Sequence, residues 1–578
     1  MDNLAVARLL SETADLMEIS QDNPFKIRAY RNAAQVVAAL PSPVAGMSLG
    51  ERLALPGIGK DLSAKLDEIL RSGTTAMLTG LRASTPASLL DIKQLPGIGP
   101  RTMLMLWKDL GIASPADLEA AIRAGRLRAV RGFGPKKEAA LLKALAQRTS
   151  ATPRHLLPDC RERAAALSAW LSDRVPRAQI SIAGGIRRGV ELCTGVDIVA
   201  AGTPSDQRAL QEAFRSYSLV ETAQLLTPDV MAARLWGGME ARLYLSPPAR
   251  FGLTLLWQTG SDAHIDGLQA RAGSAGLTLS ASALARGSKA LDVPSEEAVY
   301  EALGLAWTPP ELREGAGEIE SAARGALPAL LQLSDLRGDL HMHTTASDGK
   351  VDAEAMAAAA RDAGLDYIVI TDHSNALPMV NGLDNVRALE HAAAIRALDA
   401  RMRGIRVLAG IECDILADGR MDLDDEVLQS LDFVAASLHS ALTQPRDVAT
   451  ARVLRAIANP WVDMLAHPTG RKLLRRDGAD LDMDAVIGAA AREGVAMEIN
   501  SQVDRLDLKP EFARQARDRG ILIAVDSDAH SPRGLLLKQW GIVMARRAGL
   551  RAEDCLNARP FKTFRAALRR SRYTAAQR

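Results

Sequence analysis

Apolar and polar positions alternate in three different ways along the chain. Up to about residue 150 the apolar residues recur at helical spacing, and short glycine-containing segments separate the helical stretches. From about Ala151 short apolar runs alternate with helical stretches, which predicts a mixed α/β region. From residue 335 onward, runs rich in β-branched residues alternate with alanine-rich helices, as in YIVITDH and VAMEINS. This last pattern is typical of βαβ units whose parallel strands close towards a barrel.

The chain is too long for a single hydrophobic core, because domains usually hold about 50–200 residues and this chain has 578. The changes of pattern predict five segments. They are a helical domain at 1–85, a second helical region at 86–150, an α/β region at 151–315, a linker at 316–334 and an α/β barrel domain at 335–578.

Composition and charge narrow the class of protein. Charged residues make up 24% of the chain and the net charge is +2, so the whole molecule is no polycation. Residues 1–150 nevertheless hold about six more lysines and arginines than acids, and the segment 559–578 is basic too. Localised basic charge is the electrostatic footprint of a protein that binds a phosphate backbone, although a solvated helix face would look the same.

Targeting signals and disulfide patterns are absent from the sequence. No run approaches the roughly 18 apolar residues that a membrane span needs, and the opening stretch carries acids instead of an apolar signal core. The cysteines Cys160, Cys193, Cys413 and Cys555 lie far apart and form no CxxC pair, which favours reduced thiols. We therefore expect a cytoplasmic protein without a membrane partner.

Gly-x-Gly segments occur three times, at 55–70, 95–106 and 130–145, and each precedes a helical stretch. Two close glycines let the backbone turn tightly and point N–H groups outward at the start of a helix, where a phosphate can bind without base readout. A glycine corner between packed helices would look alike, but the repetition and the basic residues beside it favour DNA binding. The residues predicted to bind DNA are Gly57, Gly59, Lys60, Gly97, Gly99, Arg101, Gly132, Gly134, Lys136 and Lys137.

Histidines concentrate in the last third of the chain. Six of the nine follow predicted strands there, accompanied by three acids. The residues are His341, His343, His373, His439, His467, His530, Asp348, Glu412 and Asp528. In parallel α/β folds the carboxyl ends of the strands meet at one face, so these side chains should converge. A lone histidine there would be structural, but this convergence predicts a metal centre that takes Zn, Mn or Fe in preference to Mg alone.

The segment 180–202, ISIAGGIRRGVELCTGVDIVAAG, reads as a strand, a Gly-Gly turn, a short helix and a second strand. It resembles the nucleotidyltransferase signature of family X DNA polymerases. The Gly-x-Gly segments resemble the helix-hairpin-helix motifs of that family, and NPFKIRAYRNAAQVV resembles its opening helices. In the family's lyase domain a lysine on the helix after the first hairpin can form a Schiff base with an abasic sugar. Lys65 matches that position, with a solvent-facing lysine on an amphipathic helix as the alternative.

The middle region departs from the family pattern at its metal-binding positions. In the family, two carboxylates on one strand and a third on another grip two magnesium ions. Here Gly195 stands for the first carboxylate, only Asp197 remains of the pair, and Glu240 stands for the third. Glycine offers no ligand, and a glutamate displaces its carboxylate by one methylene, so we expect no firm Mg²⁺ site.

Nucleotide contacts of the family are replaced as well. Gly185 stands where a serine contacts the nucleotide phosphate, and Ile265 and Gln269 stand where the family has Asn and Arg. Arg187 and Arg188 remain and could still bind DNA or nucleotide phosphate. We therefore expect templated polymerase activity to be lost or severely weakened.

The last third resembles the polymerase-and-histidinol-phosphatase (PHP) family, and the nine residues named above occupy all nine positions of its metal constellation. The resemblance implies that they hold up to three Mn²⁺ or Zn²⁺ ions, which activate a water, bridge a phosphate and stabilise the leaving oxygen. It implies catalytic roles for Asp348, His373, Asp528 and Arg471. Arg471 and Arg505 would clamp a second phosphate, with surface salt bridges as the alternative.

Nearly the whole chain is similar to bacterial family X DNA polymerases with a carboxy-terminal PHP domain. The resemblance implies an all-α helix-hairpin-helix region, an α/β nucleotidyltransferase-like palm and a distorted (βα)7-type PHP barrel. It implies a monomeric DNA-repair enzyme that acts on gapped, nicked or 3′-ended DNA as a metal-dependent 3′→5′ exonuclease or end phosphoesterase. Two alternatives stay open. A gap-filling polymerase would need a borrowed carboxylate, for which Glu191 lies close in sequence to Gly195, and a small-molecule phosphatase would not need three hairpins.

Overall fold

The computed structural model describes residues 3–38, 40, 43–86, 88–93, 95, 98–129, 133–150, 153–376 and 378–571. By its internal contacts the chain divides into two units. Unit 1 comprises Met1–Arg154, Arg163–Ile180 and Gly202–Leu245, and unit 2 comprises His155–Glu162, Ser181–Ala201 and Ser246–Arg578. Within the described ranges no helix is both long enough and apolar enough to span a bilayer.

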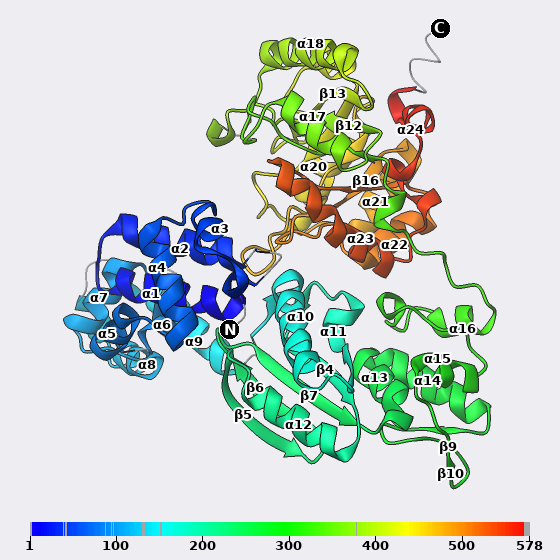
Figure 1. Ribbon diagram of the computed structural model, residues 1–578. Helices are drawn as coiled ribbons and strands as arrows, with labels where there is room; N and C mark the ends of the chain where they lie inside the picture. The colour runs from blue at the N-terminus through cyan, green and yellow to red at the C-terminus, as the bar shows by residue number, and fades with distance from the viewer. Residues whose placement is uncertain are drawn as a thin grey trace. The chain divides into compact units, whose positions relative to one another are not determined.

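The described part of residues 1–150, in unit 1, is helical, as its apolar spacing predicts (Figure 1). The helices are α1 (Asn3–Ile19), α2 (Pro24–Ala38), α3 (Leu49–Leu53), α4 (Lys60–Ser72), α5 (Ala76–Ser84), α6 (Leu89–Lys93), α7 (Pro100–Lys108), α8 (Pro115–Arg123) and α9 (Pro135–Ser150), with 3-10 turns η1 (Val44–Gly46) and η2 (Arg126–Ala129). They pack around two separate cores, one that includes the fully buried Leu10 and Leu66 and one that includes Leu106 and Leu141. The all-α prediction for this region is confirmed.

Each Gly-x-Gly segment anchors its central apolar residue in one of these cores, because Ile58, Ile98 and Phe133 are all buried. Gly59 and Gly99 form the amino-terminal caps of α4 and α7, with extended backbone and no side-chain cap. The first N–H groups of a helix have no partner within the helix. The anchored residue therefore fixes the turn from which α4 and α7 start, beside the exposed Gly59 and Gly99.

The predicted α/β region at 151–315 is shared between the two units. Unit 1 holds α12 (Pro204–Arg215) and an antiparallel meander of β5 (Val220–Thr227), β6 (Val230–Leu235) and β7 (Glu240–Ser246). Met231 at the centre of the meander pairs with Leu225 on one side and Leu243 on the other. Unit 2 holds β1 (His155–Leu156), α11 (Gly184–Arg188), β3 (Leu192–Cys193) and β4 (Gly195–Ala201). Helix α10 (Leu157–Arg174) and strand β2 (Gln179–Ile182) belong partly to each unit.

The segment that follows in unit 2 is a small helical subdomain. Its elements are η3 (Pro248–Arg250), α13 (Phe251–Thr259), α14 (Asp262–Ser274), β8 (Thr278–Leu279), β9 (Leu284–Arg286), β10 (Lys289–Ala290), α15 (Glu296–Ala302), η4 (Pro310–Leu312) and α16 (Glu318–Ala323). Leu256, Leu268 and Tyr300 lie in its core. The three short strands form an antiparallel sheet in the order β10-β9-β8.

Seven parallel strands form the barrel of unit 2 and follow one another in sequence order. They are β11 (Gly338–Asp339), β12 (Tyr367–Ile370), β13 (Arg406–Asp414), β14 (Phe433–Ser437), β15 (Met464–Leu465), β16 (Ala496–Asn500) and β17 (Ile523–Asp526). The pairing is in register from strand to strand, with Glu412 opposite Ala435, for example. An isolated parallel bridge between Met342 and Ala529 brings the last strand back to the first, so the barrel is nearly closed. This confirms the predicted (βα)7-type barrel.

Helices between and after the strands surround the barrel (Figure 1). They are α17 (Ala353–Asp362), α18 (Asn385–Arg401), α19 (Asp425–Ser430), α20 (Arg446–Ala458), α21 (Met483–Glu493), α22 (Pro510–Asp518), α23 (Lys538–Arg547) and α24 (Phe561–Ala567), with 3-10 turns η5 (Leu333–Asp335), η6 (Pro378–Val380), η7 (Pro532–Leu537), η8 (Ala552–Asp554) and η9 (Leu556–Ala558). Parallel strands covered by helices are buried on both faces. For that reason runs such as FVAAS and AMEIN are buried throughout.

Aromatic residues close the amino-terminal end of the barrel. Tyr367, the first residue of β12, stacks on Phe564 of α24 with ring centroids 4.6 Å apart. Arg570, which follows α24, forms an ion pair with the buried Asp463 at 2.6 Å. With this end filled, the carboxyl ends of the strands remain as the face where chemistry takes place in such folds.

Candidate metal centre

The nine residues predicted from the histidine pattern lie at the carboxyl ends of the barrel strands or in the loops just beyond them. From β11 to β17 the strands supply, in order, His341, His343 and Asp348; His373; Glu412; His439; His467; and Asp528 with His530. Only β16 supplies none of them. Successive strand residues point to opposite faces, so the pair spacing of His341 and His343 turns both imidazoles the same way, and both are fully buried.

Ligand atoms from these residues gather in four groups, each within 4.8 Å. The groups are His343, Asp348, His373 and His530; His341, Glu412 and His467; His341, His343 and Asp528; and His373, Glu412 and His439. Several residues belong to two groups, so the structure joins all nine in one connected cluster. A carboxylate shared between groups, as Glu412 is, suits a centre with neighbouring metal ions.

Buried nitrogen and oxygen atoms in this cluster face one another without forming hydrogen bonds. Glu412 Oε2 lies 2.8 Å from His373 Nδ1 and 3.5 Å from His341 Nε2, yet none of these atoms has a hydrogen-bond partner among the described residues. Two ligands that each bind one ion at about 2.0–2.3 Å stand roughly 3–4 Å apart. Each buried polar atom left without a partner costs about 1–3 kcal/mol. A metal ion would satisfy these atoms, so the donor set fits metal binding.

Burial and neighbouring charges shift the histidine pKa values in both directions. Burial would lower the pKa of His341, His373 and His530, but nearby carboxylates outweigh it and raise all three, that of His530 to about 9. Burial lowers the pKa of His467 to about 3 and that of His343 to about 4, which keeps both imidazoles neutral at physiological pH. Burial by itself would raise the pKa of Glu412, but the surrounding histidines outweigh it and hold that pKa well below its usual value. Neutral imidazole and ionised carboxylate are the forms that bind a metal.

A second layer of carboxylates orients the imidazoles from behind. Glu498, buried on β16, accepts a hydrogen bond from His341 Nδ1 at 2.7 Å and one from the backbone N–H of His467 at 2.5 Å. Asp414 Oδ1 lies 3.2 Å from His439 Nδ1. An imidazole whose Nδ1–H is bonded to a carboxylate presents Nε2 to a metal. The histidine pattern did not reveal Glu498, although an acid inside the apolar run AMEIN is a usable signal.

Two of the nine candidate ligands, His467 and Asp528, have left-handed backbone conformations. The φ angle is +26° at His467 and +51° at Asp528. Non-glycine residues in this region are strained by roughly 1–3 kcal/mol, and such strain clusters at functional sites. Hydrogen bonds hold both positions: Glu498 accepts from the His467 backbone, and the Asn500 side chain donates to Asp528 Oδ2 at 3.1 Å.

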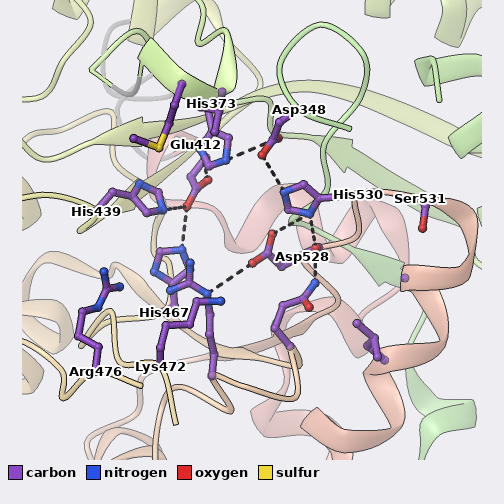
Figure 2. Close-up of a pocket in the computed structure, with 16 residues that line it drawn as sticks. Asp348, His373, Glu412, His439, His467, Lys472, Arg476, Asp528, His530 and Ser531 are labelled. Atoms are coloured by element: carbon purple, nitrogen blue, oxygen red, sulfur yellow. Dashed lines mark hydrogen bonds and ion pairs between the residues drawn. The ribbon is translucent and has the colours of Figure 1, made fainter. Parts of the chain in front are cut away.

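All residues of the cluster except His341 and His343 line a cavity of about 590 Å³. Lys472, Arg476 and Arg505 line one side of it, and we call these three residues the cationic wall. Figure 2 shows Lys472 and Arg476 on the side of His467, across the cluster from Asp348. Cavities of roughly 300–1,000 Å³ take small ligands. Candidate metal ligands beside a cationic wall suit a molecule with more than one phosphate group.

Arg505 is the member of the cationic wall whose donors are least used within the protein. Its side chain is buried, and its Nε and Nη1 have no hydrogen-bond partner in the described part of the chain. Its Nε lies 3.9 Å from Asp528 Oδ2. By contrast, Lys472 pairs with Asp504 at 2.9 Å and Arg476 donates to a backbone carbonyl at 2.8 Å. Guanidinium donors suit phosphate oxygens, so the geometry fits the phosphate clamp predicted for Arg505.

Arg471, predicted to be catalytic, does not line the cavity. Its Nε donates to the carbonyl of Arg505 at 2.9 Å, its Nη2 to the carbonyl of Leu506, and its Nη1 to Glu191 Oε1 at 2.7 Å. Each nitrogen of this buried guanidinium thus has a partner within the protein. Arg471 thus lies behind the cationic wall, and of the two candidate arginines only Arg505 lines the cavity. A catalytic role for Arg471 stays a prediction.

Within the described residues, Asp197 and Glu240 belong to none of the candidate metal-ligand groups. Asp197 lies against the Gly-Gly turn, where an ideal Cβ on Gly184 would come within 2.3 Å of its Oδ2. Gly185 follows in α11, and Gly195 begins β4. Glu240, which belongs to unit 1, has a side chain that is 49% exposed and lies 3.4 Å from Arg242.

Arg187 and Arg188 are engaged in ion pairs within unit 2. Arg187 donates to both oxygens of Glu296, at 2.6 and 2.8 Å. The same carboxylate accepts two bonds from the fully buried Arg313, at 2.7 and 2.9 Å. Arg188 donates to Glu314 at 3.1 Å. Both guanidinium groups, which on sequence grounds could still bind DNA or nucleotide phosphate, are therefore bonded to carboxylates of this chain.

The hairpin residues of the first region lie at helix starts. Gly57, Gly59 and Lys60 are exposed before and at the start of α4, with a φ of +75° at Gly57 that only glycine adopts easily. Gly99 is exposed at the start of α7, and Gly134 precedes α9. These positions agree with the turn geometry that the motif predicts.

The other predicted residues of this region either lie outside the described residues or have contacts within the chain. Gly97 and Gly132, and the side chains of Arg101 and Lys136, lie outside the described residues. Lys137 places its ammonium 4.2 Å from the ring centroid of Phe133. Lys65, the candidate lyase residue, pairs with Glu68 at 2.8 Å along α4, the arrangement expected of a lysine on an amphipathic helix.

Known families match separate regions of the chain, and one relative matches nearly its full length. Family models match as Helix-hairpin-helix domain (1–75), SAM-like Helix-hairpin-helix tandem (89–147), DNA polymerase beta thumb (254–314) and PHP domain (339–502). A Bacillus subtilis protein named DNA polymerase/3′-5′ exonuclease PolX is 33% identical over 571 residues, which are 98% of this chain and 99% of that protein. A Probable phosphatase of Acetivibrio thermocellus is 32% identical over 201 residues, and the Escherichia coli Probable phosphatase YcdX is 31% identical over 203 residues. Each of these two alignments covers 33% of this chain and 78% of the relative.

These matches first define a class, the family X DNA polymerases that carry a PHP domain. The helix-hairpin-helix and thumb domains of that class imply DNA binding, and the PHP domain supports a metal-dependent phosphoesterase. The identity to the Bacillus subtilis protein extends over nearly the full length of both chains. The chain therefore belongs to the PolX family.

Proposed function

We propose that this protein is a DNA-repair enzyme that hydrolyses phosphodiester bonds at DNA 3′ ends, as a metal-dependent 3′→5′ exonuclease and end phosphoesterase. The observation that carries the proposal is the convergence of six imidazoles and three carboxylates in one connected cluster, seven of whose nine residues line a single cavity. The name of the Bacillus subtilis relative, which includes 3′-5′ exonuclease, supports it. The donor set favours Mn²⁺ or Zn²⁺, with up to three ions.

The candidate metal ligands and the cationic wall would act on different phosphates of the DNA. The bound ions would activate a water and withdraw charge from the scissile phosphate. Asp348 and His530, whose side chains are 28% and 33% exposed, are the most accessible of the nine, so the DNA end enters on their side. Asp348, His373 and Asp528 line the cavity and keep the catalytic roles that the family resemblance implies. Arg505 would hold the neighbouring phosphate and fix the register of the strand.

The helix-hairpin-helix region would deliver the DNA. Anchored turns at the starts of α4 and α7, beside the exposed Gly59 and Gly99, suit phosphate contacts without base readout. We propose gapped, nicked or 3′-ended DNA as the substrate and a monomer as the working form, in the cytoplasm. Non-specific backbone binding lets one enzyme act on ends of any sequence.

Templated nucleotide addition is proposed to be lost or weak, with no firm Mg²⁺ site in the palm. Gly195 provides no ligand, and Glu240 is half exposed beside an arginine. Glu191, the carboxylate near Gly195 in sequence, is bonded to Arg471 and so is not a ready substitute ligand. Metals in a nucleotidyl-transfer site share their carboxylates, so the loss of one ligand disturbs both ions.

A labelled primer annealed in gapped DNA tests the proposed activity directly. With Mn²⁺ and no nucleotides, the protein should shorten the primer stepwise from its 3′ end, and a chelator should stop the reaction. The Glu412→Gln variant, which removes the shared ligand charge, should lose the activity. An intact primer with the unaltered protein, or equal shortening by the variant, would overturn the proposal.

A small-molecule phosphatase is the second candidate, favoured by the names of the two Probable phosphatase relatives. It uses the same metal cluster and differs only in substrate. Rapid hydrolysis of p-nitrophenyl phosphate, with gapped DNA left intact under the same conditions, would favour this candidate over the exonuclease.

A further inference from the structure

The cationic wall is carried by two chain segments that Arg471 ties together. Lys472 follows Arg471 directly, and its backbone N–H bonds to the carbonyl of Arg476 at 2.9 Å, which forms a small turn. Arg471 also donates to the carbonyl of Arg505 at 2.9 Å. The guanidinium of Arg471 thus sits behind all three residues of the wall and links one segment to the other.

The outermost bond of Arg471 goes to Glu191, which lies 280 residues earlier in the chain. Glu191 belongs to the loop between α11 and β3, in the segment 180–202 that resembles the nucleotidyltransferase signature. The Glu191 side chain is 20% exposed and that of Arg471 is 7% exposed, so the 2.7 Å pair is largely shielded from water. Loss of one partner from a shielded ion pair leaves an uncompensated charge, which is strongly unfavourable.

Other contacts within unit 2 also hold this loop against the barrel domain. Gly189 packs so closely on α23 that an ideal Cβ would lie 2.2 Å from Val543 Cγ1. Arg547 of α23 donates to the carbonyl of Arg188 at 3.3 Å and pairs with Glu314 at 3.2 Å. The position of Glu191 therefore does not depend on its bond to Arg471 alone.

We propose that Glu191 is a positioning residue for phosphodiester hydrolysis and acts through Arg471 to hold the cationic wall in place. A loop of the former polymerase signature thereby serves the phosphoesterase, which gives this degenerate region a present function. The inference rests on the proposed function and adds a residue from outside the barrel to its DNA site. A misplacement of about 1 Å in groups that position a substrate can cost roughly 100-fold in rate.

The test compares a substrate whose neighbouring phosphates the cationic wall can bind with a substrate that has no neighbouring phosphate. Gapped DNA presents neighbouring phosphates, whereas methyl p-nitrophenyl phosphate is a phosphodiester without any. Glu191→Ala should raise KM for gapped DNA roughly tenfold or more, with kcat for methyl p-nitrophenyl phosphate changed less than about twofold, because the metal ligands are untouched. Glu191→Gln keeps an oxygen that can accept from Arg471 and should show a smaller rise in KM.

Two controls separate positioning from general damage. Glu314→Gln alters the ion pairs of Glu314 with Arg188 and Arg547 and leaves the contacts of Arg471 in place. The KM of this variant for gapped DNA should therefore match that of the unaltered protein. In an Arg471→Gln background, Glu191→Ala should have no additional effect, because residues that act through one contact are not additive. Melting temperature and bound Mn²⁺ are measured for each variant, and Glu191→Gln serves if the alanine variant does not fold.

Unchanged KM for gapped DNA in Glu191→Ala would overturn the inference. So would additive effects of the Glu191 and Arg471 substitutions, or an equal loss on both substrates. A different result bears on the proposed function instead: if the unaltered protein with Mn²⁺ hydrolyses neither substrate, the phosphoesterase itself is refuted.

Discussion

Replacing Glu498 by glutamine would remove one negative charge from behind the metal centre at nearly constant size. The carboxylate is fully buried on β16 and accepts from His341 Nδ1 at 2.7 Å and from the His467 backbone at 2.5 Å. A glutamine has one acceptor oxygen and an NH2 group, so it can satisfy only one of these two donors. Two ligands would lose their fixed orientation, although all nine ligand side chains would remain.

The expected result is weaker metal binding. Outer partners of metal-binding histidines are worth about 10–100-fold in affinity, or about 1.4–2.7 kcal/mol. The loss of one hydrogen bond to a charged group, about 1.5–3 kcal/mol, gives the same range. Equilibrium dialysis with Mn²⁺ measures the effect, and Glu426→Gln, at an exposed position of the same domain, is the matched control. A dissociation constant for Glu498→Gln within about twofold of the unaltered protein would refute the orienting role.

Duplex binding should weaken steeply with salt, with a slope of about −0.9 in log affinity against log salt for each phosphate contact; a flat plot would contradict binding through the hairpins. Arg505→Gln should lower kcat/KM for gapped DNA roughly 10–100-fold, because unused charged donors beside the metals are lost. Steady-state assays check this, with Arg475→Gln, whose side chain is 78% exposed, as control. Acid should destabilise the helical subdomain of unit 2. Burial alone would raise the pKa of Glu296, but the hydrogen bonds from Arg313 and Arg187 outweigh burial and lower this pKa from 4.5 to about 2. The ionised Glu296 thereby adds roughly 3 kcal/mol to the free energy of unfolding. This stabilisation is complete above pH 4.5 and is lost as the pH falls through about 2. Denaturant unfolding over that range should show a steeper loss for the unaltered protein than for Glu296→Gln, and parallel curves would contradict the assignment.

The barrel could be predicted because burial on both faces makes each parallel strand a short apolar run. The metal residues could be found because they punctuate the ends of those runs, as His373 does after YIVI and His439 does shortly after FVAAS. Strand-end position alone implies convergence, so no long-range information was needed. Their roles as ligands remain a prediction.

The second layer could not be predicted in the same way. Glu498 and Arg471 owe their roles to partners that the fold brings together from distant segments, and Glu191 is 280 residues from its partner. The motif HPTGR shows an arginine near a ligand, but the side-chain direction depends on the carbonyls of Arg505 and Leu506 behind it. Sequence spacing carries no information about such contacts. The wall residues Lys472 and Arg476 were missed for the same reason.

Primer fate on gapped DNA with Mn²⁺ and all four nucleotides tests the central claim, that the PHP cluster is the catalytic centre of this chain. His343 is fully buried in the cluster and belongs to two of its ligand groups. The unaltered protein should shorten the primer, and His343→Ala should neither shorten nor extend it. Continued shortening by the variant would place the hydrolysis elsewhere. Extension by the variant at about 0.1–10 nucleotides per second, an ordinary enzymatic rate, would show that the palm still works as a polymerase.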